Sequence, residues 1–197
     1  MVENIPVEVA RRIKLVIVDI DGVLTDGGII LGTINQVETV EFKRFEIQDG
    51  LGLKLMKWAG LHVYLVSGRR SSANVARARD LNIEYREADG GYKLRVVEQL
   101  VRTHNLDWSE VCCIGDDLPD IALMRRAGLP VAVGNAVPEV TRLCVWQTRR
   151  TGGHGAVREL AEALLQARGE WDALIEQYES KRSEMPVTEQ PSCLPRL

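Results

Sequence analysis

The chain has 197 residues, of which 45% are hydrophobic and 27% charged, and its formal net charge is −3. This length and composition are typical of one soluble globular domain with a full hydrophobic core. The low net charge and the lack of a run rich in Lys and Arg argue against nucleic acid as a partner. No apolar run approaches the roughly 18 residues that a membrane-spanning helix needs, so we expect no membrane partner.

The N-terminus and the cysteines predict a reducing cellular compartment. Residues 1–13 lack an apolar segment before a small-residue cleavage site, so we expect no secretory signal and a cytoplasmic protein. Cys112 and Cys113 lie in an apolar run, where adjacent side chains point to opposite faces of a strand, and we expect buried thiols. The four cysteines also lack the CxxC spacing of a metal site.

Strands and helices alternate along the chain. Runs rich in Val, Ile and Leu predict strands at 15–18, 61–66, 83–86, 111–114, 129–133 and 143–147. Amphipathic patterns predict helices at 49–59, 71–80, 92–103, 119–128, 138–141, 156–167 and 171–180, the first of them capped by Asp49. This order predicts a Rossmann-like, doubly wound α/β fold with a mostly parallel sheet. We expect one domain at 14–182, between a lead-in at 1–13 and a disordered tail at 183–197.

One insertion interrupts this order after the first predicted strand. Residues 29–45 divide into two β-rich halves around Gly32 and Asn35, and the second half alternates polar and apolar residues. This pattern predicts a small β-hairpin flap that projects from the first strand–helix connection. The chain has no insertion of the size of a large cap domain.

Two acidic residues follow the first strand in the sequence KLVIVDIDGVLTDGG at 14–28. Asp19 is expected at the carboxyl end of this strand and Asp21 just beyond it, at the edge where open α/β sheets bind ligands. Two carboxylates this close repel each other unless a cation neutralises them, so the pair suggests a metal site. A DxD pair alone favours the plainer interpretation, a turn.

Polar residues also follow the later strands: Ser67, Lys93, Asp116, Asp117 and Asp120. Each alone has an ordinary interpretation as a cap, a solvated charge or an acidic helix start. Because the carboxyl ends of parallel strands share one edge, we expect these residues to converge with the DxD pair. Together they suit phosphoryl transfer: one Asp attacks phosphorus, a second transfers a proton, and Ser, Lys and Mg²⁺ hold the phosphoryl oxygens.

These motifs, DxDGVLTDG, the strand-ending SGR, the isolated lysine and GDDxxD, resemble those of the haloacid dehalogenase superfamily of phosphatases. The order of the motifs matches across residues 15–120. The DGVLTDG form, the absence of a large cap and the C-terminal GGHGAVRE segment narrow the resemblance to its phosphatases of 3-deoxy-D-manno-octulosonate 8-phosphate, over residues 14–169. The resemblance implies a Mg²⁺-dependent phosphomonoesterase of lipopolysaccharide precursor synthesis that forms an aspartyl-phosphate.

The resemblance also implies a role for each residue that matches a family motif. Asp19 matches the nucleophile, which is also a metal ligand. Asp21 matches the general acid/base, whose backbone carbonyl binds Mg²⁺, and Asp116 matches the remaining metal ligand. Ser67 and Lys93 match the pair that stabilises the phosphate.

Further matches are expected to orient groups or to bind substrate. Asp117 and Asp120 would orient the metal's waters or the motif lysine. The positions where the family contacts sugar acid or phosphate are Asp49, Gly50, Lys54, Arg69, Arg77 and Lys93. Lys54 and Arg77 would otherwise be interpreted as solvated charges on helices.

Three positions depart from the family pattern. Gln48 stands where a basic residue is common, Lys54 where an arginine is common, and Tyr92 where a polar Asn or Asp precedes the motif lysine. A lysine lacks the planar fork with which arginine binds carboxylates. The departures leave the predicted catalytic set unchanged and put the identity of the substrate in doubt.

The resemblance implies an assembly as well. Capless members are typically tetramers in which a neighbour's hairpin and C-terminal segment help to close the site, so we expect a homotetramer that uses residues 29–45 and 152–155. The glycines of 152–155 are equally typical of a plain loop before a helix.

Two alternatives remain open. The same chemistry suits a related nonulosonate 9-phosphate or another small phosphosugar, although the residues after Ser67 favour the octulosonate branch. From a different class, the chain would be a non-catalytic phosphosugar-binding or tetramerisation module, but such modules often lose the residues that Asp21 and Lys93 match. A receiver domain is disfavoured because its acceptor aspartate follows a later strand.

Overall fold

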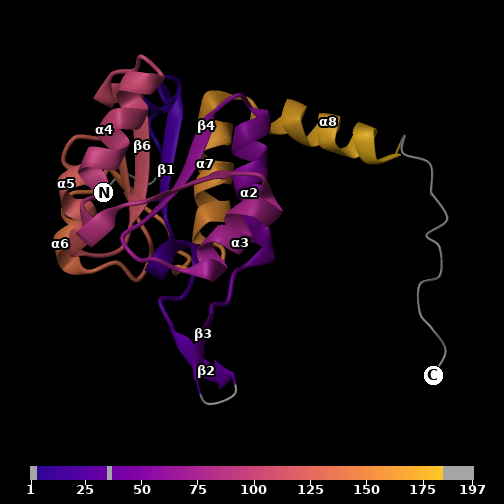
Figure 1. Cartoon of the computed structure of the whole chain (residues 1–197). Helices are drawn as coiled ribbons and strands as arrows, with labels where there is room; N and C mark the ends of the chain where they lie inside the picture. The colour runs from indigo at the N-terminus through magenta and orange to yellow at the C-terminus, as the bar shows by residue number, and fades with distance from the viewer. Residues whose placement is uncertain (1–3, 35–36, 184–197) are drawn as a thin grey trace, which may run out of the picture.

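A parallel β-sheet forms the centre of the chain (Figure 1). Within residues 4–34 and 37–183, which a computed structural model describes, six strands form this sheet in the spatial order β5-β4-β1-β6-β7-β8. Their bounds are Leu15–Asp19 for β1, His62–Ser67 for β4, Glu84–Glu87 for β5, Val111–Gly115 for β6, Leu129–Ala132 for β7 and Trp146–Gln147 for β8. The predicted doubly wound α/β fold is confirmed.

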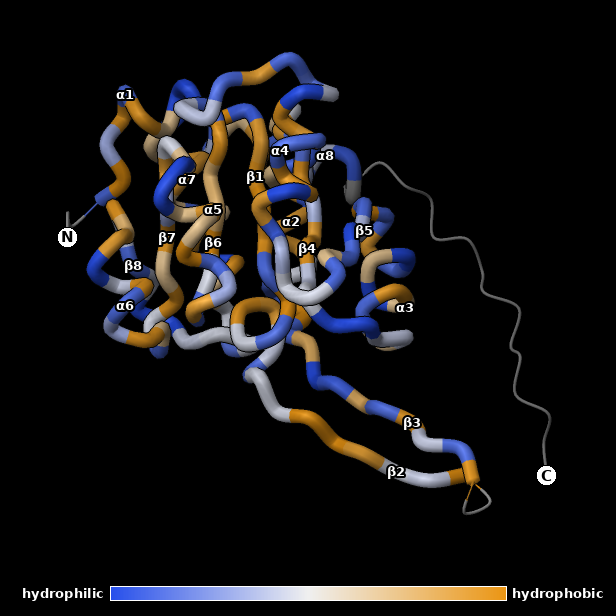
Figure 2. The backbone as a smooth tube through the Cα atoms, turned by 60° about the vertical axis from the view of Figure 1, so that its left-hand side comes forward, coloured by the Kyte–Doolittle hydropathy of each residue, from blue (hydrophilic) through white to orange (hydrophobic). Residues whose placement is uncertain are grey.

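The first strand lies at the centre of this sheet, between β4 and β6. Its apolar residues are buried on both faces, as expected where helices cover both sides of a parallel sheet. Val16 and Val18 belong to one hydrophobic cluster, whereas Leu15 and Ile17 belong to the other. In Figure 2 the strands in the middle of the molecule are coloured mainly as hydrophobic residues. The strand that ends at the DxD motif therefore joins the two halves of the core.

Helices pack in a layer on each face of the sheet (Figure 1). One layer contains α1 (Val7–Ala10), α2 (Ile47–Trp58), α3 (Ser72–Leu81), α7 (Ala156–Arg168) and α8 (Trp171–Ser183). The other contains α4 (Lys93–Thr103), α5 (Ile121–Met124) and α6 (Pro138–Thr141). Short helical turns complete the connections: η1 (Ile20–Leu24), η2 (Asp89–Gly91), η3 (Trp108–Glu110) and η4 (Leu118–Asp120).

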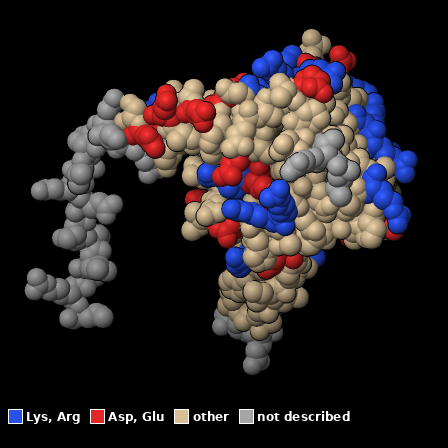
Figure 3. Space-filling model, turned by 180° about the vertical axis from the view of Figure 1, so that it is seen from behind, with Lys and Arg blue, Asp and Glu red and all other residues tan. Residues whose placement is uncertain are grey.

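The predicted hairpin is present and projects from the body of the molecule (Figures 1 and 2). It consists of the antiparallel strands β2 (Ile30–Ile34) and β3 (Glu38–Phe42), with Ile30 opposite Phe42. Among the described residues no large cap domain accompanies it. Its apolar side chains are unusually exposed, with 65% of Leu31 and 57% of Phe42 open to solvent, and Figure 3 shows few charges on this projection.

Two details of the predicted elements are wrong. Asp49 does not cap α2, because that helix begins two residues earlier and Glu46 accepts the hydrogen bond of its first turn. The carboxylate of Asp49 instead accepts from the backbone N–H groups of Gly155 and Arg158 at 3.2 and 2.8 Å, at the start of α7. The last strand is shorter than predicted, since Leu143 still hydrogen-bonds to the end of α6.

The sequence also made predictions about the cysteine thiols, membrane-spanning helices and the C-terminal tail. Cys112 and Cys113 are buried and belong to opposite hydrophobic clusters, as predicted. In the part of the chain that the structure describes, no helix has both the length and the hydrophobicity for crossing a bilayer. The predicted tail lies outside the described residues, apart from the final residue of α8.

Candidate active site

The predicted catalytic residues meet at the carboxyl edge of the sheet. Asp19 ends β1, Ser67 ends β4, Asp116 follows β6, and Lys93 begins the helix that follows β5. A cavity of about 380 Å³ opens at this edge. Its lining includes Asp19, Asp21, Arg69, Lys93, Asp116, Asp117 and Asp120.

A buried lysine joins two carboxylates at the floor of this site. The Nζ atom of Lys93 lies 2.7 Å from Asp19 Oδ1 and 2.7 Å from Asp120 Oδ1, and all three side chains are almost fully buried. Burial lowers the pKa of Lys93, but the charges of Asp19 and Asp120 outweigh it and raise the pKa above its ordinary value. The lysine therefore stays charged and holds the Asp19 carboxylate in place.

An acidic cluster surrounds Asp19. One carboxylate oxygen from each of Asp19, Asp116 and Asp120 lies within 4.8 Å of the others. Burial, and then the neighbouring charge of Asp120, raise the pKa of Asp19 well above its ordinary range and that of Asp116 to about 6. Such an oxygen-only donor set fits a hard divalent cation, which would relieve the repulsion between the carboxylates.

The backbone leaves room for this cluster at Gly22. Gly22 has a φ of +99°, and a Cβ atom there would lie 2.0 Å from Asp116 Oδ2. Any larger residue would therefore displace the Asp116 carboxylate or strain the turn. The two oxygens of Asp120 are already engaged, because Oδ1 accepts from Lys93 and Oδ2 accepts from the Asp116 N–H at 3.2 Å. Asp117 is exposed to the cavity and caps the next turn through the Leu118 N–H at 2.8 Å.

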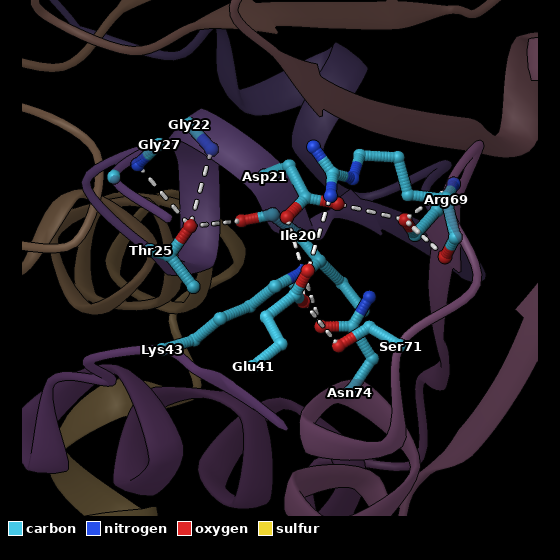
Figure 4. A network of polar contacts seen from close by, with 12 residues as sticks. Ile20, Asp21, Gly22, Thr25, Gly27, Glu41, Lys43, Arg69, Ser71 and Asn74 are labelled. Atoms are coloured by element: carbon cyan, nitrogen blue, oxygen red, sulfur yellow. Dashed lines mark hydrogen bonds and ion pairs between the residues drawn. The ribbon is translucent and has the colours of Figure 1, made fainter. Parts of the chain in front are cut away.

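Asp21 lies in the turn η1 and faces Ser67. The Ser67 hydroxyl donates to Asp21 Oδ2 at 2.8 Å and accepts from the Arg69 N–H at 3.0 Å. Thr25 holds the turn together: its Oγ1 accepts from Gly22 N–H at 3.3 Å and donates to the carbonyl of Ile20 at 3.1 Å (Figure 4). The threonine of the DGVLTDG sequence thus has a structural role next to the candidate acid/base.

The structure also places one residue at the site that sequence reasoning missed. Lys43 follows β3 at the base of the hairpin, and its Nζ lies 2.5 Å from Asp21 Oδ1 (Figure 4). In the sequence Lys43 belongs to an alternating polar and apolar run, which gives no sign of a buried contact. The only available signal was the repeated pattern of Glu41 and Lys43 on one face of the predicted strand.

Four of the predicted substrate-binding residues do not line the cavity: Asp49, Gly50, Lys54 and Arg77. Asp49 is fully buried against the start of α7. Arg77 packs beside Gly50, where a Cβ atom would lie 2.5 Å from its Nη2, and donates to Asp80 at 2.8 Å. Lys54 is half-buried on α2. Arg69, by contrast, lies at the cavity and pairs with Glu41 at 3.1 Å.

The glycine-rich segment at 152–155 packs against the loop that follows β1 in the same chain. The Gly153 N–H donates to the carbonyl of Val23 at 2.9 Å, and a Cβ atom at Gly152 would lie 1.7 Å from the carbonyl oxygen of Gly22. Arg44, at the base of the hairpin, donates to the carbonyl of Gly153 at 3.0 Å. The glycines are therefore needed for close backbone contact with the DxD turn.

Comparison with known proteins agrees with this geometry. The family of haloacid dehalogenase-like hydrolases matches residues 87–160. The 3-deoxy-D-manno-octulosonate 8-phosphate phosphatase KdsC of Yersinia pestis is 37% identical over 158 residues, which cover 80% of this chain and 82% of that protein. KdsC of Escherichia coli strain K12 is 34% identical over 163 residues, covering 83% of this chain and 85% of the relative.

Solved structures of phosphatases with this activity also resemble this chain. The 3-deoxy-D-manno-octulosonate 8-phosphate phosphatase of Moraxella catarrhalis, in complex with magnesium, phosphate and KDO, superposes with a TM-score of 0.81 at 36% identity. The match covers 87% of this chain and 97% of that chain. The cobalt-bound enzyme of Haemophilus influenzae gives a TM-score of 0.74 at 33% identity, covering 82% and 92% of the two chains.

Proposed function

This chain belongs to the haloacid dehalogenase-like hydrolases and is a KdsC-like phosphatase, and on that premise we propose that it hydrolyses 3-deoxy-D-manno-octulosonate 8-phosphate to the sugar acid and phosphate. The observation that carries the proposal is the buried Asp19 carboxylate, held by Lys93 inside an acidic cluster and two residues before Asp21. We further propose that the reaction serves lipopolysaccharide precursor synthesis in the cytoplasm.

In the first step, a lone pair on an Asp19 carboxylate oxygen forms a bond to phosphorus. The bond between phosphorus and the ester oxygen breaks, and the electron pair goes to the leaving sugar oxygen. Asp21 faces the cavity; once the Ser67 hydroxyl turns from Oδ2 to a phosphoryl oxygen, Oδ2 takes a proton from solvent, gives it to the leaving oxygen and becomes a carboxylate again. The products of this step are the sugar alcohol and an aspartyl-phosphate at Asp19.

In the second step, Asp21 takes a proton from a water molecule while the water oxygen attacks phosphorus. The bond from phosphorus to Asp19 breaks and the carboxylate is restored, so that inorganic phosphate leaves and Asp21 carries its proton again. Lys93 stays beside Asp19 throughout, and its charge, with the Ser67 hydroxyl, suits the phosphoryl oxygens on which negative charge redistributes.

The acidic cluster fits Mg²⁺. Asp19 and Asp116 would hold the ion through their carboxylates and Asp21 through its backbone carbonyl, while Asp120 keeps Lys93 and the Asp116 backbone in place. A bound divalent cation would neutralise these carboxylates and the charge of the phosphate. Asp120 could either bind the metal directly or orient its neighbours. Both of its oxygens already accept hydrogen bonds, which favours the orienting role.

A homotetramer would complete the site. The apolar side chains of the hairpin, Ile30, Leu31, Ile34 and Phe42, are between 47% and 65% exposed, and such a patch is typical of a surface that packs against a partner. Arg69 lines the cavity of its own chain, which supports the proposal that it binds the sugar carboxylate through bidentate hydrogen bonds. We propose a structural role for the other predicted substrate contacts, at the edge of the site that a neighbouring chain would close. These residues are Asp49, Gly50, Lys54 and Arg77.

One experiment separates this function from its alternatives. Phosphate release is measured on a panel of sugar phosphates, including the octulosonate 8-phosphate and nonulosonate 9-phosphates, with Mg²⁺ and after chelation by EDTA. We expect the highest kcat/KM for the octulosonate, no turnover in EDTA and recovery with Mg²⁺. Preference for a nonulosonate would change the substrate, for which Gln48, Lys54 and Tyr92 leave room. No turnover of any ester with metal present would favour the binding-module alternative.

A further inference from the structure

The most unusual charge outside the sheet edge is the lysine at the base of the hairpin. The side chain of Lys43 has no solvent exposure, whereas its neighbours Phe42 and Arg44 are exposed. An ammonium group loses several kcal/mol of hydration free energy on burial unless partners replace the water. The position of Lys43 is therefore determined by the groups that it contacts.

Those groups match the donors of the ammonium one for one. Its Nζ lies 2.5 Å from Asp21 Oδ1, 3.0 Å from Asn74 Oδ1 and 3.4 Å from Glu41 Oε1 (Figure 4). A lysine has three N–H donors and no acceptor, so all three can be used. The partners come from η1, α3 and β3, and Asn74 is itself fully buried.

Glu41 fastens the hairpin at a second point. One of its oxygens accepts from the Ser71 hydroxyl at 2.7 Å, and the other pairs with Arg69 Nη2 at 3.1 Å. Lys43 follows β3 directly, and its Nζ lies 3.4 Å from Glu41 Oε1, so the two side chains leave the hairpin base on the same side. The base of the hairpin is thus bound both to the loop after β4 and to the candidate acid/base.

The two oxygens of Asp21 have different partners. Oδ1 accepts from Lys43, and Oδ2 accepts from the Ser67 hydroxyl at 2.8 Å. A serine hydroxyl has only one proton to donate. When Ser67 donates that proton to a phosphoryl oxygen, it releases Oδ2, and of the two donors only Lys43 continues to hold the carboxylate.

We propose that Lys43 is a positioning residue, which holds Oδ1 of Asp21 so that Oδ2 exchanges the proton with the leaving oxygen and then with water. The inference rests on the proposed function, because it presupposes that Asp21 is the acid/base. It assigns to the hairpin base a part in proton transfer within its own chain. Lys43 would differ from a substrate-binding residue because it acts through Asp21 and does not touch the substrate.

The test uses Lys43→Met in the full-length protein with Mg²⁺ present. Two esters are compared, the octulosonate 8-phosphate, whose alkoxide needs a proton to leave, and p-nitrophenyl phosphate, whose phenolate leaves without one. We expect kcat on the sugar phosphate to fall about 10- to 100-fold, part of the roughly 10²- to 10⁴-fold effect of acid–base catalysis, with KM within about threefold of the unmodified protein.

With p-nitrophenyl phosphate the first turnover is resolved by stopped flow. In Lys43→Met the burst of phenolate should keep its rate within about threefold, while the steady-state rate falls because the second step still needs Asp21. Lys14→Met is the matched control, since Lys14 pairs with Glu110 at the opposite end of β1 and is 61% exposed. A burst slowed as much as the turnover of the sugar phosphate, a change in KM alone, or an unchanged kcat would each overturn the proposal.

A double variant keeps the test decisive if Lys43→Met does not fold. Asp21→Asn with Lys43→Met removes both members of the pair, so that no unpaired buried charge remains. If Lys43 acts through Asp21, the double variant should match Asp21→Asn alone within about twofold in kcat. A further tenfold loss would show that Lys43 acts independently and contradict the proposal. Full activity of Asp21→Asn would instead refute the acid/base assignment on which the proposed function depends.

Discussion

The two aspartates of the DxD motif lie two residues apart but have different surroundings. Asp19 is held from the body of the molecule, since its partner Lys93 begins α4 and is itself fixed by Asp120. Asp21 is held from the periphery, where Lys43 approaches from the base of the hairpin. The proposed nucleophile is therefore held within the buried end of the sheet, whereas the proposed acid/base is held from the base of a largely exposed hairpin.

On the proposed roles of Asp21 and Lys43, changes in a hairpin far from the hydrophobic core should affect a site at the sheet edge. The floor of the site needs only the strand order and the two helical layers. Asp21, the proposed acid/base, is in contact with the hairpin base, which Lys43 joins to Asp21 and Glu41 joins to Ser71. Changes in the two regions should therefore have different consequences. Changes around Asp19 and Lys93 should affect both stability and chemistry, whereas changes in the hairpin should affect turnover and assembly.

The largest effect is expected from Asp19→Asn. The amide cannot form the aspartyl-phosphate, so phosphate release should fall by about 10⁴-fold or more, the range seen when a covalent nucleophile is removed. The fold should persist, because the amide oxygen can still accept from Lys93. Activity is measured by phosphate release and folding by circular dichroism; turnover near that of the unmodified protein would remove Asp19 from the mechanism.

Loss of Lys93 should affect both properties. Lys93→Met leaves Asp19 and Asp120 buried without a cation, and breaking a buried pair in this way costs about 3–5 kcal/mol. We expect a lower midpoint of urea unfolding in the absence of metal and a large loss of kcat. Lys14→Met again serves as control, because an exposed pair contributes about 0–1 kcal/mol. Equal stability of the two variants would contradict the account of the buried floor.

Metal and pH should act together on stability. Without metal, the pKa of Asp116 is about 6 in the folded protein against an ordinary value of 3.8, and that of Asp19 is raised as well. The folded state then binds more protons than the unfolded state between about pH 4 and 6, so stability falls as the pH rises through this window. Mg²⁺ should reverse the loss.

The corresponding measurement is the Tm with and without Mg²⁺ at several pH values. The increase caused by saturating Mg²⁺ should reach roughly 5–10 °C above pH 6 and shrink towards pH 5, where protons compete for the carboxylates. Asp116→Asn should weaken this dependence. A Tm shift that is the same at every pH would show that the acidic cluster is not the metal site.

The smallest effect on stability is expected from the exposed apolar side chains of the hairpin. Leu31→Asp places a charge on a side chain that is 65% exposed, so the free energy of unfolding of one chain should change by no more than about 0.5 kcal/mol. Assembly should be affected instead, with a smaller species in sedimentation velocity and a lower kcat/KM. Val7→Asp, at an exposed position on α1, is the control. An unchanged sedimentation coefficient would exclude the hairpin as a contact between copies.

The sequence was informative where function follows the order of strands. Asp19, Ser67 and Asp116 could be placed because each stands at the end of an apolar run, and parallel strands bring those ends together. Lys93 could be placed because its helix begins at the same edge. These residues depend only on local pattern and topology, which a single sequence displays.

Contacts between distant segments could not be found in this way. The partners of Asp49, at the start of α7, lie more than 100 residues away in sequence, so an acidic residue near a helix start was interpreted as a local cap. Lys43 contacts Asp21 from the base of the hairpin, 22 residues along the chain, and its alternation with Glu41 on one face of the predicted strand does not say what that face meets. The contacts of such residues can be predicted only when the path of the loops is known, and turn chemistry alone does not specify that path.

The most direct test of the account is to identify the phosphorylated residue. A ³²P-labelled sugar phosphate is mixed with the enzyme, quenched in acid during the first turnover and digested, and the labelled peptide is sequenced by mass spectrometry. We expect an acyl-phosphate on Asp19, absent from Asp19→Asn and longer-lived in Asp21→Asn. Label on another residue, or product formed at full rate by Asp19→Asn, would contradict it.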